Sequence, residues 1–428
     1  MYFCSAKKIN MTKLHKNKKP SAIGGTMIIA GTLIGGGMIA IPIAASGLWY
    51  FRTLFILVYT WFCMSCAGLM VLEANLHYKK GASFDTMVKD LLGRNWNIIT
   101  GLTITFVLYT LVYAYITVGG GITNSILEAV SPSSEIPHYV GGLLFCFILA
   151  FCVWISTKAI DRASTILIIA MAISFIAMIT GLLNNIDYDV LSNHTALNSE
   201  ESYWPYAFFI LPVCVTSFCF HSITPSLTLY YNKDAKKISK SIIIGSIIAL
   251  VAYTLWVTAI HGNLPREEFL TINNAEDNVQ EMMDRLNSFV SIGIIKKLIN
   301  FFTYAAIISS FLGASLGLFD YLADLFKIQN TKLGRLKTAS ITFLPPLIAS
   351  FVFPYGFVVA ISYVGFAAAI WSIIVPALMV LKSRKRFPNG KYKVFGGKPL
   401  VYFILLFAII TLLAQLITQF GLVKSFSA

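Results

Sequence analysis

Long apolar runs separated by short polar segments make up most of this chain. Each run holds about 17 to 32 residues. A helix of about 20 apolar residues crosses the roughly 30 Å hydrocarbon core of a lipid bilayer. The pattern therefore predicts an all-α polytopic membrane protein with about eleven transmembrane helices. The predicted spans lie near residues 22–48, 51–77, 97–128, 139–157, 163–183, 205–231, 239–262, 298–326, 337–353, 355–381 and 399–422.

The first and sixth runs both carry residues that break a helix. AGTLIGGGMIAIP (30–42) holds three consecutive glycines, and in the sixth run Pro212 and Pro225 bracket VTSFCFHSIT. Glycine costs about 1 kcal/mol in a helix interior, and proline removes a backbone donor. The breaks lie five spans apart, so the two helices run in opposite directions. This arrangement is typical of two inverted five-helix repeats with a binding site at the midplane.

This interpretation defines the domain organisation. A transporter domain covers 21–422, with the first repeat at about 21–183 and the second at about 205–381. One extra helix follows at about 399–422, and a basic tail precedes the domain at 1–20.

A break inside a membrane exposes backbone groups that must find partners. Free N–H groups at the start of a half-helix attract a carboxylate, and free C=O groups attract an ammonium group or a cation. Both kinds together suit a zwitterion such as an amino acid. The alternative is that the glycines only allow close helix packing, as they often do in membrane helices.

Composition and charge set the orientation. The chain is 57% hydrophobic and 12% charged, with a net charge of +14 and a mean hydropathy of +0.74. With the amino terminus in the cytoplasm, the inside segments hold 27 of the 33 Lys and Arg residues. The positive-inside rule then predicts an inner-membrane protein with a cytoplasmic N-terminus and a periplasmic C-terminus. The net charge therefore calls for no nucleic-acid partner. Either Met1 or Met11 can be the start of the chain.

Two polar segments have helical patterns. SFDTMVKDLLG (83–93) predicts a short amphipathic helix along the inner surface, and the outside segment 263–297 predicts a short helix.

Motifs of other function classes are absent from the sequence. HExxH, the GxxxxGK[ST] loop and clusters of Cys and His at metal-ligand spacing do not occur. We therefore expect no enzyme activity, no cofactor, no resident metal and no obligatory protein partner. A channel would need rings of charge or repeated filter motifs on identical subunits. Two unlike broken helices in one chain instead favour a closed site for a single substrate. A sensor derived from a transporter stays open as an alternative.

Four stretches carry a family resemblance: AGTLIGGGMIAIP (30–42), LEANLHYKKGASFDTMVKDLLG (72–93), LPVCVTSFCFHSITPSL (211–227) and SSFLGASLGLFDYLAD (309–324). They resemble the hydroxy and aromatic amino acid permeases of the amino acid–polyamine–organocation superfamily, most nearly the bacterial tyrosine-specific transporters. The resemblance covers nearly all of 21–422. It implies the inverted-repeat fold and the import of an aromatic amino acid, here expected to be tyrosine, by proton symport.

The resemblance also implies roles for backbone groups. Gly35, Gly36 and Gly37 would offer N–H groups to the substrate carboxylate. The carbonyls of Ser217, Phe218 and Cys219 would receive its ammonium group. The family more often has glycine where Cys219 and Ser222 stand, so this chain departs from the family pattern at a position that affects the backbone shape of the break and the size of the pocket.

Aromatic side chains near the breaks are candidates for holding the substrate ring. Tyr109 and Tyr113 share one face of the third span because they are four residues apart. Phe218 and Phe220 flank the second break and can cover an aromatic ligand. Packing within the protein is the alternative for all four.

The coupling ion is either H⁺ or Na⁺. His221 lies inside the second break and can carry a proton, or it can make a structural hydrogen bond. In sodium-coupled relatives of the superfamily, positions like Ala306, Ser309 and Ser310 face first-span carbonyls, here those of Gly31 and Ile34, and bind Na⁺. Some proton-coupled relatives place a lysine from span five there, which this chain lacks. A sodium-coupled symporter of another neutral amino acid therefore remains an alternative.

Overall fold

The computed structural model describes residues 22–130, 137–155, 157–193, 202–275, 277–290, 293–329, 331–354 and 356–427. The predicted basic tail at 1–20, with both candidate start residues, lies outside this part of the chain. Every regular element in the described ranges is a helix.

Helices of the first half are α3 (Ala22–Leu33), α4 (Gly36–Ala45), α5 (Tyr50–Asn75), α6 (Phe84–Leu92), α7 (Arg94–Val130), α8 (His138–Ile155), α9 (Thr157–Leu183) and α10 (Tyr188–Ser192). The second half contains η2 (Trp204–Tyr206), α11 (Ala207–Ser217), η3 (His221–Ile223), α12 (Thr224–Tyr230), α13 (Ala235–Asn263), α14 (Glu268–Asn274), α15 (Asn278–Phe289), α16 (Gly293–Leu325), α17 (Lys332–Val352), α18 (Phe357–Ala368), η4 (Ala369–Ile374), α19 (Val375–Arg386) and α20 (Gly397–Gln419).

The prediction of an all-α membrane protein is confirmed. Among the described residues, eight helices are long and apolar enough to cross a membrane, and the bent pair α3 and α4 adds a ninth. The two other predicted spans are present as α8, of 18 residues, and α17, of 21 residues. Between α3 and α4 the chain bends by 52°. The sixth crossing is also interrupted, because α11 ends at Ser217 and η3 begins only at His221.

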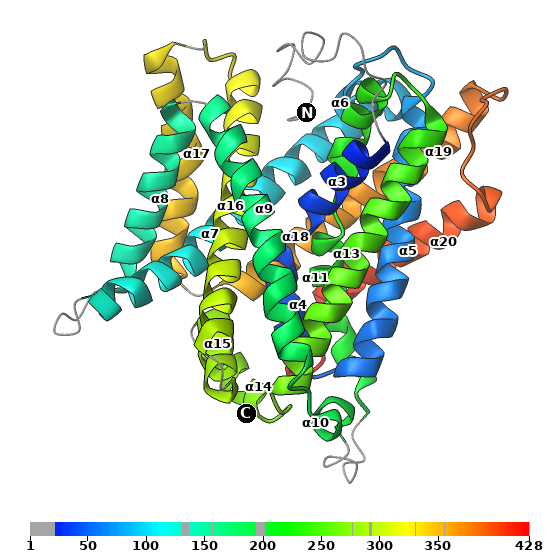
Figure 1. Ribbon diagram of the computed structural model, residues 1–428. Helices are drawn as coiled ribbons and strands as arrows, with labels where there is room; N and C mark the ends of the chain where they lie inside the picture. The colour runs from blue at the N-terminus through cyan, green and yellow to red at the C-terminus, as the bar shows by residue number, and fades with distance from the viewer. Residues whose placement is uncertain are drawn as a thin grey trace.

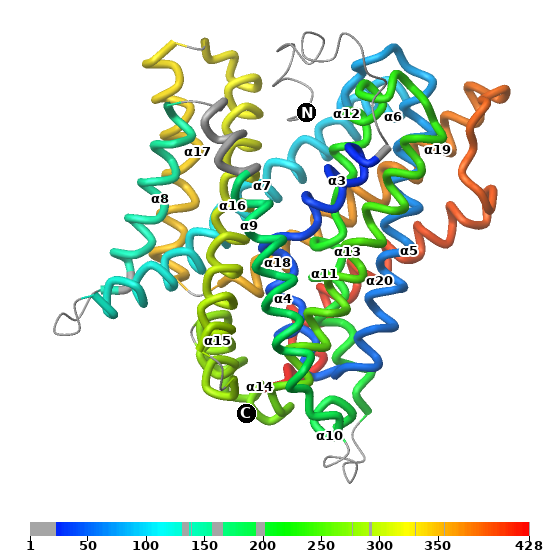
Figure 2. Tube along the Cα trace, in the orientation of Figure 1, coloured from blue at the N-terminus to red at the C-terminus, as the bar shows by residue number. Residues whose placement is uncertain are grey.

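The molecule has two ends that differ in their elements (Figure 1). The end that carries α6 is called the α6 face, and the opposite end, which carries α10 and α14, is called the α14 face. The Cα trace shows α3, α4, α11 and α13 running together through the middle of the molecule between these faces (Figure 2).

Side-chain hydrogen bonds join α3, α5, α12 and α13 into one body. The Gly25 N–H of α3 donates to the Tyr231 hydroxyl, directly after α12, over 2.8 Å, and the Ser241 hydroxyl of α13 donates to the same oxygen over 3.3 Å. Ser246 of α13 bonds to Trp61 and Ser65 of α5, each over 3.0 Å. We call these helices, with α4 and α11, the four-crossing body.

A glycine brings α3 and α13 into close contact. A Cβ on Gly245 would lie 2.6 Å from Ile29 Cβ and 2.8 Å from the Thr26 carbonyl oxygen. Because no larger residue fits there, α13 follows α3 closely up to the first break.

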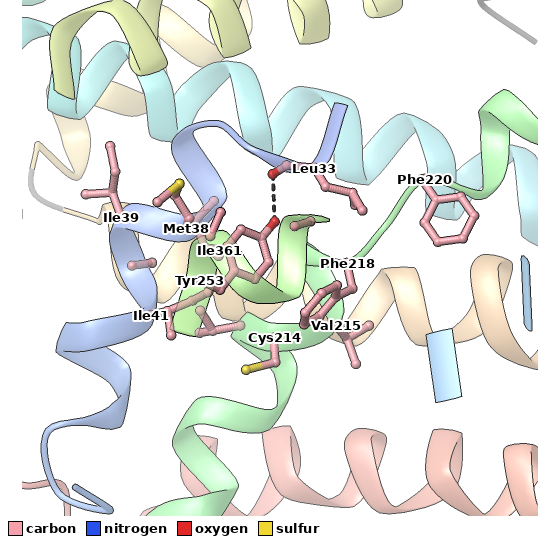
Figure 3. Packing of buried hydrophobic residues seen from close by; sticks show 14 of the residues in the cluster. Leu33, Met38, Ile39, Ile41, Cys214, Val215, Phe218, Phe220, Tyr253 and Ile361 are labelled. Atoms are coloured by element: carbon pink, nitrogen blue, oxygen red, sulfur yellow. Dashed lines mark hydrogen bonds between the residues drawn. The ribbon is translucent and has the colours of Figure 1, made fainter. Parts of the chain in front are cut away.

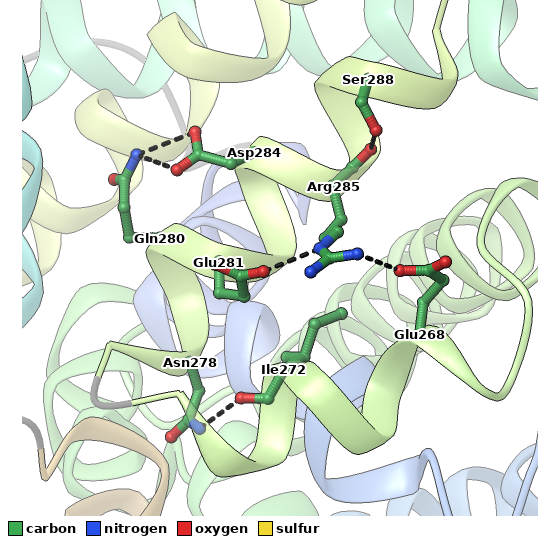
Figure 4. A network of polar contacts seen from close by, with 8 residues as sticks. All are labelled: Glu268, Ile272, Asn278, Gln280, Glu281, Asp284, Arg285 and Ser288. Carbon is green, nitrogen blue, oxygen red and sulfur yellow. Dashed lines mark hydrogen bonds and ion pairs between the residues drawn. The ribbon is translucent and has the colours of Figure 1, made fainter.

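Both loop predictions have structural counterparts. The amphipathic segment forms α6, where the Ser83 hydroxyl accepts a hydrogen bond from the Thr86 N–H as the N-cap. The segment 263–297 forms two short helices rather than one. Arg285 of α15 joins them, since it bonds to Glu268 of α14 and to Glu281 of its own helix over 2.7 Å each (Figure 4).

Candidate substrate site

Steric contacts with neighbouring helices, rather than backbone strain, require glycine at the first break. Gly35, the N-cap of α4, has φ −174°, an extended conformation open to any residue. A side chain at either of two neighbouring positions would collide with another helix. A Cβ on Gly35 would lie 2.6 Å from Ser310 Oγ of α16, and one on Gly36 would lie 2.5 Å from Tyr115 Cε1 of α7. Glycine therefore allows α7 and α16 to approach the start of α4.

The start of α4 is a candidate carboxylate site. The Gly36 N–H donates to Ser310 Oγ over 2.8 Å. Tyr115, which is 6% exposed, lies with its ring against Gly36. The N-terminal N–H groups of a helix and its dipole favour an anion at this position.

The second break lies directly beside the first. The Ser217 hydroxyl, at the end of α11, donates to the Gly37 carbonyl oxygen over 3.0 Å. From Phe218 to Phe220 the chain is non-helical, and η3 follows. The two interruptions therefore meet in one place, as the inverted-repeat interpretation requires.

The negative ends of two half-helices converge on one side chain of α13. Leu33 is the last residue of α3 and Ser217 is the last residue of α11. The Tyr253 hydroxyl lies 2.6 Å from the Leu33 carbonyl oxygen and 2.7 Å from the Ser217 carbonyl oxygen. Figure 3 shows Tyr253 between the two broken helices, with its bond to Leu33.

The aromatic residues of the second break are buried within the four-crossing body. The Phe218 ring lies 4.9 Å from the Tyr253 ring, centroid to centroid. Phe220 packs on Gly68 of α5, where a Cβ would lie 2.6 Å from its ring. Cys219, between them, is half-buried.

The two tyrosines singled out in the third span face away from the breaks. The Tyr109 hydroxyl donates to the Ile341 carbonyl of α17 over 2.9 Å, and the Tyr113 hydroxyl donates to the Phe353 carbonyl over 2.7 Å. Tyr115 lies at the break instead. Residues 113 and 115 point to nearly opposite sides of a helix, and the sequence offers no signal for which side faces the first break.

The candidate coupling residues are divided between two places. On α16, the Ser309 hydroxyl donates to the Ala306 carbonyl of its own helix over 3.1 Å, while Ser310 is engaged by Gly36. Ile168 of α9 lies beside Gly31, since a Cβ placed on Gly31 would be 3.8 Å from the Ile168 side chain. Ile34, in the bend, donates its N–H to the Ala30 carbonyl over 2.9 Å.

His221 is completely buried in the second break. Its imidazole stacks on Phe220 at 5.0 Å and lies 6.3 Å from Trp371 of η4. The backbone of Met64 on α5 faces the imidazole, but neither ring nitrogen reaches a hydrogen-bond partner among the described residues.

Comparison with known proteins agrees with this arrangement. The family model described as the tryptophan/tyrosine permease family matches residues 18–415. A tryptophan-specific transport protein of Haemophilus influenzae is 50% identical over 96% of this chain and 99% of its own length. The tyrosine-specific transport system 1 of the same organism is 31% identical over 91% of this chain and 94% of its own length.

The fold is also known from solved structures. The crystal structure of MhsT in complex with L-phenylalanine superposes with a TM-score of 0.56 at 12% identity, over 92% of this chain and 100% of that one. The two Haemophilus influenzae relatives are transport proteins, and the chain is accordingly a multi-pass permease rather than an enzyme. It belongs to the tryptophan/tyrosine permease family.

Proposed function

We propose that this protein imports tryptophan across the bacterial inner membrane by proton symport with alternating access. The observation that carries the proposal is the meeting of opposite backbone charges at the two breaks. The Gly36 N–H marks a positive helix end, and the Leu33 and Ser217 carbonyls mark two negative ends. A zwitterion held between these groups satisfies both signs.

Tryptophan replaces tyrosine as the preferred substrate because of the relatives. Within one organism, the tryptophan-specific relative is 50% identical to this chain and the tyrosine-specific relative is 31% identical. The motifs behind the expectation of tyrosine are features of the whole tryptophan/tyrosine permease family, so they do not separate these two substrates.

The roles of the residues follow from their contacts. The substrate carboxylate would take the place of the Ser310 hydroxyl as the acceptor of the Gly36 N–H, with Gly35, Gly37 and Tyr115 beside it. The ammonium group would bind carbonyls of the second break, at Ser217, Phe218 and Cys219. The Phe218 and Phe220 rings would contact the indole. The smaller ring of tyrosine would make less contact with them.

His221 is the proposed proton carrier. A buried imidazole without a hydrogen-bond partner is neutral unless an acceptor reaches it, and a conformational change can supply one. Sodium at Gly31, Ile34, Ala306, Ser309 and Ser310 is the second candidate. We favour the proton, because the Ser310 hydroxyl already accepts a hydrogen bond from the Gly36 N–H. In this proposal the α6 face is cytoplasmic.

The test is uptake of labelled Trp, Tyr and Phe by proteoliposomes under imposed H⁺ or Na⁺ gradients. We expect saturable tryptophan uptake driven by an inward H⁺ gradient and unchanged when choline replaces Na⁺. Absence of uptake of all three would overturn the substrate class, and dependence on Na⁺ would overturn the coupling.

A variant at position 221 tests the role of His221. His221→Gln should retain exchange of internal for external tryptophan while losing accumulation against a gradient, because binding remains and proton coupling does not. Accumulation at the wild-type level would exclude His221 as the carrier.

A further inference from the structure

Tyr253 places a single hydroxyl between the ends of both broken helices. The Leu33 and Ser217 carbonyl oxygens lie 2.6 Å and 2.7 Å from it, and the side chain is 0% exposed. A tyrosine hydroxyl carries one proton, so it cannot donate a full hydrogen bond to both carbonyls at once. One of the two oxygens is therefore under-satisfied at any moment.

Both oxygens also lie where negative potential is concentrated. The C-terminal end of a helix carries roughly half an elementary charge of negative sign, and α3 and α11 bring two such ends together. Carbonyl oxygens gathered in this way are ligands for a hard cation or an ammonium group.

The position of Tyr253 is fixed from two sides. Gly245 holds α13 tightly against α3 two turns earlier, and the Phe218 ring packs against the tyrosine ring. The hydroxyl therefore stays between the two carbonyls as long as the four-crossing body is intact.

We propose that the Tyr253 hydroxyl occupies the place of a monovalent cation between the two breaks. In this place it positions the ends of both broken helices. It holds the two helix ends together without a bound metal ion and leaves one carbonyl for the ammonium group of the substrate. When the ammonium group of the substrate binds the Ser217 carbonyl, the Tyr253 hydroxyl donates its hydrogen bond to the Leu33 carbonyl. The substrate step of this inference rests on the proposed function.

The test compares Tyr253→Phe with Tyr231→Phe. The second variant removes another buried hydroxyl that joins α3 to α13, but at a distance in sequence from both breaks. Thermal unfolding of each purified protein is measured without amino acid in choline, Li⁺, Na⁺ and K⁺ chloride. We expect Li⁺ or Na⁺ to raise the unfolding temperature of Tyr253→Phe relative to choline, beyond any rise in the wild type and in Tyr231→Phe.

Transport gives the second readout. In choline, the KM of Tyr253→Phe for tryptophan should rise about tenfold, since the hydroxyl that holds the Leu33 and Ser217 carbonyls in place is lost, and the best cation should restore part of the affinity. Equal cation responses in all three proteins would overturn the inference. The unfolding measurement contains no amino acid, so it stands even if tryptophan is not the substrate.

If Tyr253→Phe does not fold, 2,3,5-trifluorotyrosine at position 253 keeps the ring and the hydroxyl. This more acidic hydroxyl binds the carbonyls more tightly and competes better with the ammonium group, so the KM for tryptophan should rise. An unchanged KM would then overturn the inference.

Discussion

At the residue scale, the site depends on close approach to backbone groups. The glycines at 35 and 36 are needed because Ser310 and Tyr115 contact them directly, and their φ angles play no part. The polar side chains act on the same backbone: Ser310 accepts from Gly36, and Tyr253 donates to the helix ends. A substitution that only adds volume here should therefore remove binding.

Gly36→Val should abolish tryptophan binding while the protein still folds and inserts. The added methyl groups collide with the Tyr115 ring and cover the N–H that would hold the carboxylate. We expect a loss of affinity of at least about 100-fold, as when a charged hydrogen bond is removed. Equilibrium binding of labelled tryptophan to purified protein measures it. Gly313→Ala is the matched control, because a Cβ at Gly313 meets nothing within 4 Å; wild-type binding by Gly36→Val would refute the carboxylate assignment.

Asp277, the N-cap of α15 outside the membrane spans, should make stability depend on pH. Burial raises the pKa of this carboxyl to about 6, against the opposing backbone N–H groups of Gln280 and Val279. Since the pKa in the folded protein exceeds the unfolded value of 3.8, the contribution of Asp277 to stability is complete below about pH 4 and is lost as the pH rises through about 6. Asp277→Asn keeps a capping side chain but does not titrate. Its unfolding temperature should exceed that of the wild type by a few degrees at pH 7, and the difference should vanish near pH 4. Parallel curves across this range would contradict the assignment.

At the scale of elements, one buried ion pair fixes the second crossing to the tenth at the α6 face. Glu73 of α5, 1% exposed, accepts two hydrogen bonds from Arg384 of α19, over 2.7 Å and 2.8 Å. The Val394 N–H, in the loop before α20, donates to the same carboxylate over 2.6 Å. This bidentate geometry is the strongest form of such a pair.

Glu73→Gln should destabilise the protein by up to about 3 kcal/mol, since it leaves the Arg384 charge, only 16% exposed, without its anionic partner. Removing both charges in Glu73→Met with Arg384→Met should restore much of the loss. Chemical denaturation in detergent measures both. Arg386→Gln is the control, because the Arg386–Asp90 pair is exposed and should contribute little. A double variant as unstable as Glu73→Gln would show that packing, rather than charge, sets the effect.

At the scale of the whole molecule, α14 and α15 form a lid on the α14 face. Arg266, before α14, donates to the Ser46 and Gly47 carbonyls after α4, over 3.3 Å and 2.9 Å. On the other side, the Asp277 carboxylate contacts Gly121 of α7, so that its Cγ lies 3.5 Å from a Cβ placed there. The lid therefore contacts both the broken first crossing and α7.

Cross-linking the lid to α7 should stop transport. A disulfide needs a Cβ–Cβ separation of about 3.5–4.5 Å, and the Asp277 Cγ lies 3.5 Å from a Cβ placed on Gly121, so cysteines at 121 and 277 are close enough to be tested for a cross-link. Oxidation of the Gly121→Cys, Asp277→Cys variant should reduce tryptophan uptake by proteoliposomes to background, and a reductant should restore it. The reduced double variant and the single Asp277→Cys variant are the controls for the added thiols. Full uptake in the oxidised double variant would show that the lid does not need to move.

The sequence by itself determined the membrane class, the crossings and the two breaks. Hydrocarbon thickness sets the length of each apolar run, and Gly and Pro interrupt helices for local steric reasons. Both signals are contained in short stretches of chain, so 30–42 and 211–227 marked the positions of the two breaks. The partition of charge between loops is equally local, and it carries the orientation proposed here.

Only the tertiary structure decided which side chains meet at the breaks. Tyr115 rather than Tyr109 or Tyr113 lies against Gly36, because the rotation of α7 is set by its contacts with α8, α16 and α18. Tyr253 reaches two helix ends that are 220 and 36 residues away in sequence. Helix rotation and packing distance are fixed by the sum of many interhelical contacts, and no single stretch of sequence records them.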